Sequence, residues 1–342
     1  MSLKFDSLEE VAEAMTAPGK GILAADESTG TIGNRLSQIN TESSFENRNA
    51  YRDLLFSADG MENYISGVIL YDETLRQSSL EGNILYPEYL SNKGVIPGIK
   101  VDMGAHDLPK SDGEKITNGL DGLDERLKEY RNLGARFAKW RAVINISDDN
   151  PSGYCISTNA HALARYAALC QSNDIVPIVE PEVIMDGAHD IDDSFVVTEE
   201  VLQTVFFELY SQGVSLEQMV LKPNMVLSGY DASDRAGIDE VANATLQCFF
   251  RTVPAAVPGI AFLSGGQSDE DATAHLNRMN QILGENKIWN LTFSYGRALQ
   301  QPALKAWQGK EENIKAAQDA FMNRAKLNGL ATAGEYSLDM EN

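Results

Sequence analysis

Eight short apolar segments, each ending in polar or charged residues, recur along the whole chain. They occupy residues 21–26, 65–72, 96–102, 137–143, 175–182, 220–226, 259–266 and 289–296. Continuous apolar runs of this length are typical of buried parallel strands rather than of half-exposed antiparallel strands. Eight of them, alternating with helical patterns, predict an α/β protein whose strands close into a (β/α)8 TIM barrel.

Helical patterns lie between these segments, and several of them begin at a residue that can cap a helix. The predicted caps are Ser43, Thr158, Thr198 and Ser268. An extra N-terminal helix is expected over residues 7–15, before the first strand. No proline- or glycine-rich linker interrupts the chain, so the sequence predicts a single barrel domain over residues 1–342. The segment from about residue 331 is rich in small and acidic residues and is expected to form a mobile tail.

The charge balance narrows the choice of partners. Acidic residues outnumber basic ones by 50 to 28, which gives a net charge of −22. Nucleic acids and anionic membranes attract basic surfaces, so neither is an expected partner.

No apolar run approaches the ~20 residues that span a bilayer, and the first residues lack the pattern of a signal or transit peptide. The three cysteines are widely spaced, which favours reduced structural thiols. We therefore expect a cytoplasmic protein.

Lys222 stands inside the apolar segment 220–226, which has the pattern of a buried strand. Burying an ammonium group is costly unless partners are supplied or the proton leaves. An amine without its extra proton is a nucleophile that can form a Schiff base with a ketone. The structural alternative is that the lysine stem lines the barrel wall and its tip forms a salt bridge. The ends of the other predicted strands also carry ionic side chains, which favours a nucleophilic Lys222 over a purely structural one.

The C-terminal ends of the strands carry the chemistry in barrels of this kind. The predicted ends carry Asp26, Asp72, the pairs Lys100/Asp102, Lys139/Arg141 and Glu180/Glu182, and Lys222. The two members of each pair are two residues apart, so they point to the same side of a strand. If that side is the barrel interior, several cations and carboxylates converge near Lys222.

Two glycine-rich turns follow the seventh and eighth strands, where such barrels most often bind a phosphate. The turns are Ser264-Gly265-Gly266 and Ser294-Tyr295-Gly296-Arg297. Glycine lets backbone N–H groups approach an anion closely, and arginine adds a charge-assisted hydrogen bond. The cations that could hold a second phosphate elsewhere in the barrel mouth are Arg35, Lys100, Lys139 and Arg141.

Six longer segments allow comparison with known families. They are GILAADESTG at 21–30, FAKWR at 137–141, IVEPE at 178–182, LKPNM at 221–225, FLSGGQS at 262–268 and FSYGRAL at 293–299. Together they strongly resemble the motifs of class I fructose-1,6-bisphosphate aldolases and occur in the same order. The resemblance extends from about residue 10 to about residue 330.

The resemblance implies an aldehyde-lyase of glycolysis and gluconeogenesis. Such an enzyme reversibly cleaves fructose 1,6-bisphosphate to dihydroxyacetone phosphate and glyceraldehyde 3-phosphate through a lysine Schiff base. It implies that Lys222 is the Schiff-base lysine and that Glu180 is the principal acid and base, with Glu182 beside the lysine. Asp26 handles the C4 hydroxyl, and Lys139 is the neighbouring cation that favours the neutral amine.

The resemblance also assigns the phosphate contacts. Ser264, Gly265, Gly266 and Arg297 are similar to the C1-phosphate site, and Ser294 and Gly296 belong to the same turn. The residues that the resemblance implies around the other phosphate are Ser28, Arg35 and Lys100, and Arg141 is a further candidate for phosphate binding because of its charge. Family membership implies a phosphorylated sugar substrate, a homotetramer, and no metal or cofactor.

The sequence departs from the familiar pattern at Met103, where many members have a lysine, and at the chain end. Many members end in a tyrosine that assists proton exchange, whereas the nearest tyrosine here is Tyr336.

Two other functions are possible alternatives to an aldolase. A phosphosugar isomerase that forms no imine is the same-fold alternative, and a non-catalytic scaffold protein is the alternative from another class. A metal-dependent aldolase needs clustered histidines. The four histidines are scattered and are expected at the surface or as caps: His106, His161, His189 and His275.

Overall fold

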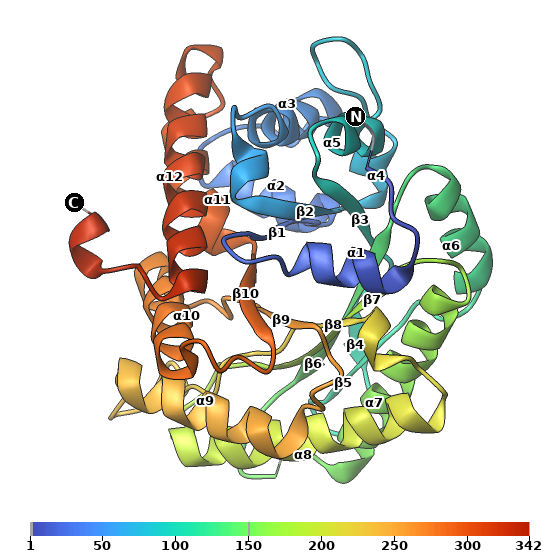
Figure 1. Cartoon of the computed structure of the whole chain (residues 1–342), viewed down its shortest axis with the longest axis vertical. Coiled ribbons are helices and arrows are strands. Elements are labelled where there is room, and N and C mark those ends of the chain that lie inside the picture. Colours follow the sequence, from blue (N-terminus) through green and yellow to red (C-terminus); the bar gives the residue numbers. More distant parts are fainter. Residues whose placement is uncertain (1–2, 150, 342) are drawn as a thin grey trace.

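The computed structural model describes residues 3–149 and 151–341, and its centre is a closed barrel of eight parallel strands (Figure 1). The strands are β1 (Gly21–Ala25), β2 (Ile65–Leu70), β3 (Ile96–Lys100), β6 (Phe137–Ile144), β7 (Val176–Val183), β8 (Val220–Leu221), β9 (Gly259–Phe262) and β10 (Asn290–Tyr295). Their order around the barrel is β1-β10-β9-β8-β7-β6-β3-β2. The predicted barrel and all eight of its strands are therefore confirmed.

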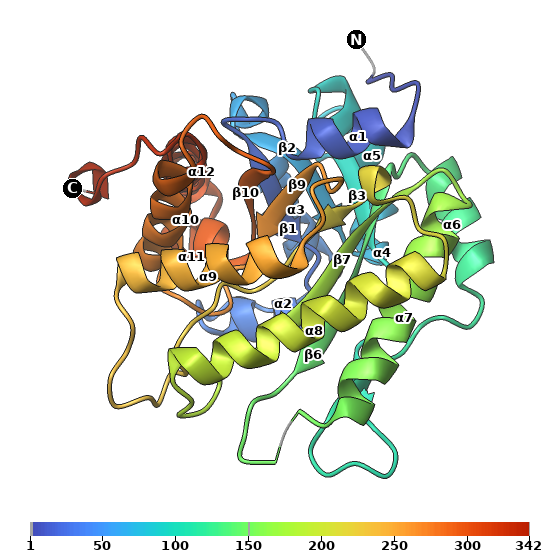
Figure 2. The ribbon, with the colours of Figure 1, turned by 60° about the horizontal axis from the view of Figure 1, so that its bottom comes forward.

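The helices surround this barrel, and Figure 2 shows α7, α8 and α9 packed side by side on its outside. The helices are α1 (Leu8–Met15), α2 (Thr29–Ser37), α3 (Phe45–Phe56), α4 (Asp72–Leu75), α5 (Tyr86–Asn92), α6 (Leu123–Asn132), α7 (Gly153–Gln171), α8 (Ile191–Ser211), α9 (Ile238–Thr252), α10 (Asp269–Leu283), α11 (Arg297–Trp307) and α12 (Ile314–Ala333). The extra N-terminal helix is α1, as predicted. In the part of the chain that the structure describes, every helix is too short or too polar to cross a membrane.

The helix caps agree only partly with the predictions. Ser268 caps α10 as expected, and its hydroxyl accepts a hydrogen bond from the Asp271 N–H at 3.0 Å. The prediction for α3 is wrong by one residue, because Ser44 and not Ser43 is the cap. The predictions Thr158 and Thr198 are wrong, since α7 and α8 begin earlier, at the caps Ser152 and Asp190.

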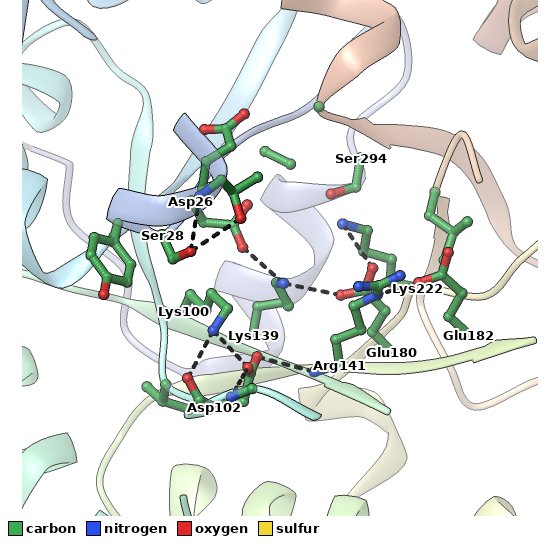
Figure 3. Close-up of a pocket in the computed structure, with 18 of the residues that line it drawn as sticks. Asp26, Ser28, Lys100, Asp102, Lys139, Arg141, Glu180, Glu182, Lys222 and Ser294 are labelled. Atoms are coloured by element: carbon green, nitrogen blue, oxygen red, sulfur yellow. Dashed lines mark hydrogen bonds and ion pairs between the residues drawn. The ribbon is translucent and has the colours of Figure 1, made fainter. Parts of the chain in front are cut away.

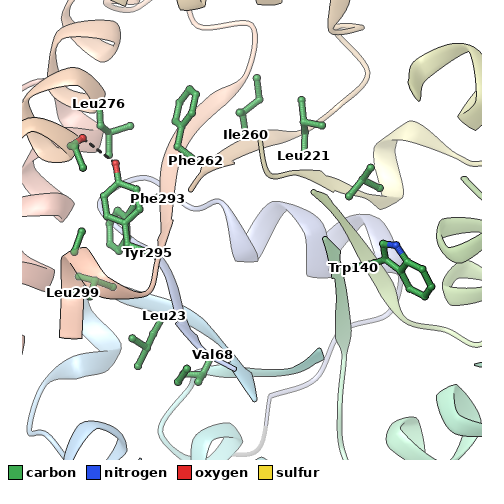
Figure 4. Packing of buried hydrophobic residues seen from close by; sticks show 14 of the residues in the cluster. Leu23, Val68, Trp140, Leu221, Ile260, Phe262, Leu276, Phe293, Tyr295 and Leu299 are labelled. Carbon is green, nitrogen blue, oxygen red and sulfur yellow. Dashed lines mark hydrogen bonds between the residues drawn. The ribbon is translucent and has the colours of Figure 1, made fainter. Parts of the chain in front are cut away.

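Two layers of apolar side chains hold the barrel together. The outer layer lies between strands and helices and includes Leu23, Trp140 and Phe262 (Figure 4). The inner layer fills one end of the barrel. There, Met15 and its neighbours on α1 pack against inward-facing residues such as Phe137. The helix α1 thus closes the end of the barrel at which the strands begin, as its position across the barrel in Figure 1 illustrates.

The inward-facing residues of β6 and β7 change from apolar to ionic along the strand. On β6 the side that starts at Phe137 continues with Lys139 and Arg141, and on β7 Ile178 is followed by Glu180. Because side chains of a strand alternate between two faces, these residues share the interior side. The strands are therefore apolar inside near α1 and ionic inside at the opposite end.

Two parts of the sheet differ from the expected pattern. A small antiparallel hairpin, β4 (Ala105–Asp107) with β5 (Lys115–Thr117), follows β3 and was not predicted, because its residues are mostly polar. The predicted strand 220–226 is regular only over β8. Pro223 lacks the N–H that would continue the ladder, although the Lys222 N–H still donates to the Val179 carbonyl at 2.8 Å.

The residues after α12 pack against the body of the protein. The helix itself continues to Ala333, and Tyr336 is buried. Arg324, also buried, donates from Nη1 to both carboxylate oxygens of Glu341 at 2.6 Å. The hydroxyl of Tyr336 donates to the same carboxylate at 2.8 Å. The mobility of this tail remains a prediction, and its docking depends on Glu341.

Replacing Glu341 with alanine is expected to destabilise the protein. The substitution leaves the Arg324 guanidinium buried with no carboxylate partner, and breaking such a pair typically costs about 3 kcal/mol. Urea unfolding measures the change in the free energy of unfolding. Asp339→Ala, which removes an exposed carboxylate from the same tail, serves as the control. Equal free energies for the two variants would contradict the docking of the tail through Glu341.

Candidate active site

A cavity of about 920 Å³ lies at the C-terminal ends of the barrel strands, opposite α1. The structure brings all fifteen predicted site residues to its walls. They are Asp26, Ser28, Arg35, Lys100, Lys139, Arg141, Glu180, Glu182, Lys222, Ser264, Gly265, Gly266, Ser294, Gly296 and Arg297. Residues far apart in the sequence lie together here because the C-terminal ends of all eight parallel strands are on the same side of the barrel.

Lys222 lies directly after β8, deep in the cavity, and is 4% exposed. Its Nζ atom lies 3.2 Å from Oε1 of Glu180, which extends from the neighbouring strand β7. The backbone hydrogen bond to Val179 fixes the position of the lysine along the barrel. The amine therefore meets a carboxylate at a distance that allows proton transfer.

Glu180 connects Lys222 to a second buried lysine. The other carboxylate oxygen of Glu180 lies 3.3 Å from Nζ of Lys139, and Lys139 pairs with Oδ2 of Asp26 at 2.8 Å. Figure 3 shows this row, in which carboxylates and ammonium groups alternate from Asp26 to Lys222. The alternation lets four ionic groups share a buried site, because each charge has a partner of opposite sign.

The row sets the charges of its members. Burial alone would raise the pKa of Asp26, but the ammonium groups of Lys139 and Lys222 outweigh it and hold that pKa well below its usual range. Burial alone would lower the pKa of Lys139, but the carboxylates of Asp26 and Glu180 hold it well above its usual range. Asp26 is therefore a carboxylate and Lys139 an ammonium at neutral pH.

The other predicted pairs also form. The Lys100 ammonium donates to Oδ1 of Asp102 at 2.6 Å, and the Arg141 guanidinium pairs with Glu182. Burial opposes the charge on Arg141, but Glu182 more than compensates and raises the arginine pKa further above its usual range. Both pairs lie on the cavity wall, so each cation can exchange part of its contact for an anionic ligand.

One end of the cavity has the features of an anion site. Gly265 and Gly266 adopt positive φ angles of 57° and 83° in the loop after β9. In the part of the chain that the structure describes, the N–H groups of both glycines have no backbone partner. The buried Ser294 hydroxyl likewise has no hydrogen-bond partner among the described residues. Polar groups left free in this way are typical of a site that awaits a ligand.

The helix α11 adds to this anion site. It begins at Arg297, and its cap residue Gly296 has no side chain to occupy the free N–H groups of the first turn. A helix N-terminus carries a partial positive charge, which favours a phosphate in its path. The guanidinium of Arg297 supplies a full charge at the same place.

Ser28 caps the start of α2, and Arg35 lies in the last turn of the same helix. The Ser28 hydroxyl caps α2 by accepting from the Thr31 N–H at 3.4 Å, and Arg35 pairs with Glu27. Glu27 in turn pairs with the buried Arg52 at 2.6 Å. Glu27 and Arg52 were not predicted. The only clue to Glu27 was its place beside Asp26, and Arg52 lies in a helical pattern that gives no hint of a site.

The histidines do not gather in one place. His161 is exposed and lies 3.1 Å from Glu208, as a surface role predicts. The expectation for His275 is wrong, because it is buried in α10, whereas His106 is exposed in strand β4 as a surface role predicts. Within residues 3–149 and 151–341, no three side chains of the metal-binding types lie close enough together to hold an ion.

Comparisons with known proteins agree with this arrangement. The family model for class-I fructose-bisphosphate aldolase matches residues 7–342. A probable fructose-bisphosphate aldolase class 1 from Xylella fastidiosa (strain 9a5c) is 56% identical over 335 residues, which cover 98% of this chain and 99% of the relative. The cytosolic fructose-bisphosphate aldolase 4 of Arabidopsis thaliana is 54% identical over 95% of this chain and 82% of the relative.

A solved structure is similar over nearly the whole chain. It is the fructose-bisphosphate aldolase from Plasmodium falciparum, in a ternary complex with TRAP and a small molecule inhibitor. The TM-score is 0.94 with 49% sequence identity, and the alignment covers 98% of both chains. The two proteins thus share one fold over nearly their whole length.

Proposed function

The chain belongs to the class I fructose-bisphosphate aldolase family, and on this premise we propose that Lys222 forms a Schiff base with the substrate. The protein is a lyase of glycolysis that reversibly cleaves fructose 1,6-bisphosphate to dihydroxyacetone phosphate and glyceraldehyde 3-phosphate. The observation that carries the proposal is the burial of Lys222 beside Glu180. The relatives favour neither a phosphosugar isomerase nor a non-catalytic scaffold.

Imine formation uses Lys222 and Glu180. The Glu180 carboxylate takes a proton from the Lys222 ammonium across the 3.2 Å contact, which frees the amine to attack C2 of the sugar. Glu180 then returns the proton to the departing C2 hydroxyl, and water leaves. The product is a protonated imine between Nζ and C2. Glu182, on the same side of β7, holds Arg141 at the edge of the site.

Carbon–carbon cleavage uses Asp26. Its carboxylate accepts the proton of the C4 hydroxyl, C4 becomes the carbonyl carbon of glyceraldehyde 3-phosphate, and the electrons of the C3–C4 bond form an enamine with C2. Lys139, 2.8 Å from Asp26, keeps that carboxylate ionised until the proton arrives. Protonation at C3 and hydrolysis of the imine then release dihydroxyacetone phosphate and restore Lys222.

The experiment that tests this assignment is borohydride reduction with dihydroxyacetone phosphate. Borohydride converts the imine into a stable secondary amine, and peptide mapping locates the modified lysine. The expected peptide contains Lys222. Modification of Lys139 or Lys100 instead would overturn the assignment.

The proposed C1-phosphate site consists of the loop Ser264–Gly266, the Ser294 hydroxyl, Gly296 and Arg297. Its support is the convergence of free N–H groups, a helix N-terminus and a guanidinium at one end of the cavity. The proposed site for the other phosphate consists of Ser28, Arg35, Lys100 and Arg141. A substrate with a phosphate at each end would span the cavity with its C2 carbon near Lys222.

Arg297→Ala is expected to weaken substrate binding more than turnover. A charge-assisted hydrogen bond to phosphate contributes about 1.5–3 kcal/mol, so KM should rise by roughly 10- to 150-fold while kcat changes little. Steady-state cleavage assays measure both constants. Arg278→Ala removes an exposed arginine that pairs with Asp239 and is the matched control. An unchanged KM in Arg297→Ala would exclude Arg297 from the phosphate site.

Three further properties are part of the proposal. The reaction needs no metal or cofactor, the protein is cytoplasmic like the relatives named cytosolic, and it forms a homotetramer. Exposed aromatic side chains on α8, Phe207 and Tyr210, support self-association. Light scattering of the purified protein should give four times the 37.4 kDa of one chain. A monomeric mass would refute the tetramer.

A further inference from the structure

Two side chains outside the proposed chemistry hold consecutive carbonyl groups of the Ser264–Gly266 loop. The Gln267 side-chain amide donates from Nε2 to the Ser264 carbonyl at 2.9 Å, and the Gln267 N–H donates to the same oxygen at 3.0 Å. The Tyr230 hydroxyl donates to the Gly265 carbonyl at 2.9 Å. Both carbonyl oxygens are therefore directed toward protein donors.

The orientation of Gln267 is fixed from behind by His275. The Nδ1 atom of His275 lies 2.6 Å from Oε1 of Gln267, and both residues are buried. Ser264 O can only accept, so Nε2 must face it and Oε1 must face the histidine. Burial lowers the pKa of His275 to about 4, so the ring is neutral at pH 7. Its single proton therefore lies on Nδ1 and is donated to Gln267.

Tyr230 is held in place by its own backbone. The Tyr230 N–H donates to the Met185 carbonyl at 2.8 Å, and the adjacent Gly229 N–H donates to the His189 carbonyl at 2.9 Å. The phenol also fills the space next to Gly266. A Cβ atom at that glycine would lie 1.7 Å from the Tyr230 hydroxyl and 2.8 Å from Nη2 of Arg297. The hydroxyl thus lies between the loop and the guanidinium.

We infer that Gln267, oriented by His275, and Tyr230 are positioning residues that shape the C1-phosphate site. An anion binds to N–H groups and is repelled by carbonyl oxygens, so a phosphate loop has to turn its carbonyls away. Donors on the Ser264 and Gly265 carbonyls do this, and they leave the N–H groups of Gly265 and Gly266 for the phosphate. The inference rests on the proposed role of this loop in binding the C1 phosphate.

The test uses fructose 1-phosphate, which carries only the C1 phosphate. Tyr230→Phe removes the hydrogen bond to the Gly265 carbonyl and the contact of the hydroxyl with Arg297. Gln267→Met removes the hydrogen bonds of the amide with Ser264 and His275, and both variants keep the side-chain volume. Each should raise KM by roughly 3- to 10-fold, with kcat within about twofold. His275→Leu should have the same effect as Gln267→Met. His275→Asn should restore KM, because the asparagine amide can donate to Gln267 in place of Nδ1.

Two controls separate this inference from its premise. Tyr154→Phe removes the hydroxyl of an exposed tyrosine on α7 and should leave both constants unchanged. Arg297→Ala probes the phosphate site directly. If Arg297→Ala raises KM but Tyr230→Phe and Gln267→Met do not, or if they lower only kcat, the positioning inference is wrong. If Arg297→Ala also leaves KM unchanged, the phosphate assignment itself fails.

Discussion

Replacing Lys222 with alanine is expected to lower cleavage of fructose 1,6-bisphosphate by roughly a thousandfold or more, because the covalent intermediate can no longer form. Trapping by borohydride should disappear in the same variant. Lys222→Arg should be equally inactive, since a guanidinium keeps its proton and cannot attack C2. Coupled cleavage assays and intact-protein mass spectrometry after borohydride treatment measure the two effects.

The control for Lys222 is Lys315→Ala, which removes a highly exposed lysine on α12. It should leave both activity and trapping unchanged. EDTA should not inhibit the unmodified protein if the reaction is metal-independent. Substantial activity in Lys222→Ala would refute the Schiff-base mechanism. Strong inhibition by EDTA that a divalent metal reverses would instead favour a metal-dependent mechanism.

Asp26→Asn is expected to separate the two halves of the reaction. An amide cannot accept the C4 hydroxyl proton, and loss of a general base typically lowers kcat by roughly 10²- to 10⁴-fold. In the proposed mechanism imine formation depends on Lys222 and Glu180, so borohydride trapping should persist. The substitution also removes the carboxylate nearest Lys139, but Glu180 remains as a partner at 3.3 Å.

The comparison variant for Asp26 is Asp107→Asn, in the exposed hairpin after β3. Its turnover should be normal. Loss of trapping together with turnover in Asp26→Asn would mean that the aspartate supports imine formation rather than cleavage. Normal turnover in Asp26→Asn would remove it from the proposed chemistry altogether.

The barrel could be predicted from the sequence because its strands are buried on both faces. Such strands form unbroken apolar runs, and the polar residues that end them mark the mouth of the barrel. The pairs Lys139/Arg141 and Glu180/Glu182 could be placed together because strand geometry alone fixes which side chains share a face. The same strand geometry predicts that the site residues lie around one cavity, as the structure shows. Their individual roles depend on the experiments above.

The features that could not be predicted depend on contacts between distant segments. His275 lies in a helical pattern between Ala274 and Leu276, and its contact with Gln267 in the loop after β9 depends on how α10 packs against that loop. Tyr230 reaches Gly265 because the loop after β8 is tied to the loop after β7. The true caps of α7 and α8, Ser152 and Asp190, are of the same capping residue types as the predicted Thr158 and Thr198, so residue type alone does not decide where these helices begin. Local pattern carries no information on any of these contacts.

The helix α1 imposes an order on folding. A ribosome makes this segment before its binding partners, and two of them lie more than 150 residues later in the chain. The helix packs against β2, β7 and the 3₁₀ turn Leu216–Gln218, and the side chain of Gln218 donates to Glu9 at 2.6 Å. A nascent chain that has not yet reached Gln218 therefore has no complete surface on which α1 can dock. Contacts of such long sequence separation slow folding and leave apolar surface exposed in the meantime. The apolar face of α1 is consequently expected to stay partly uncovered until the chain has been made as far as Gln218.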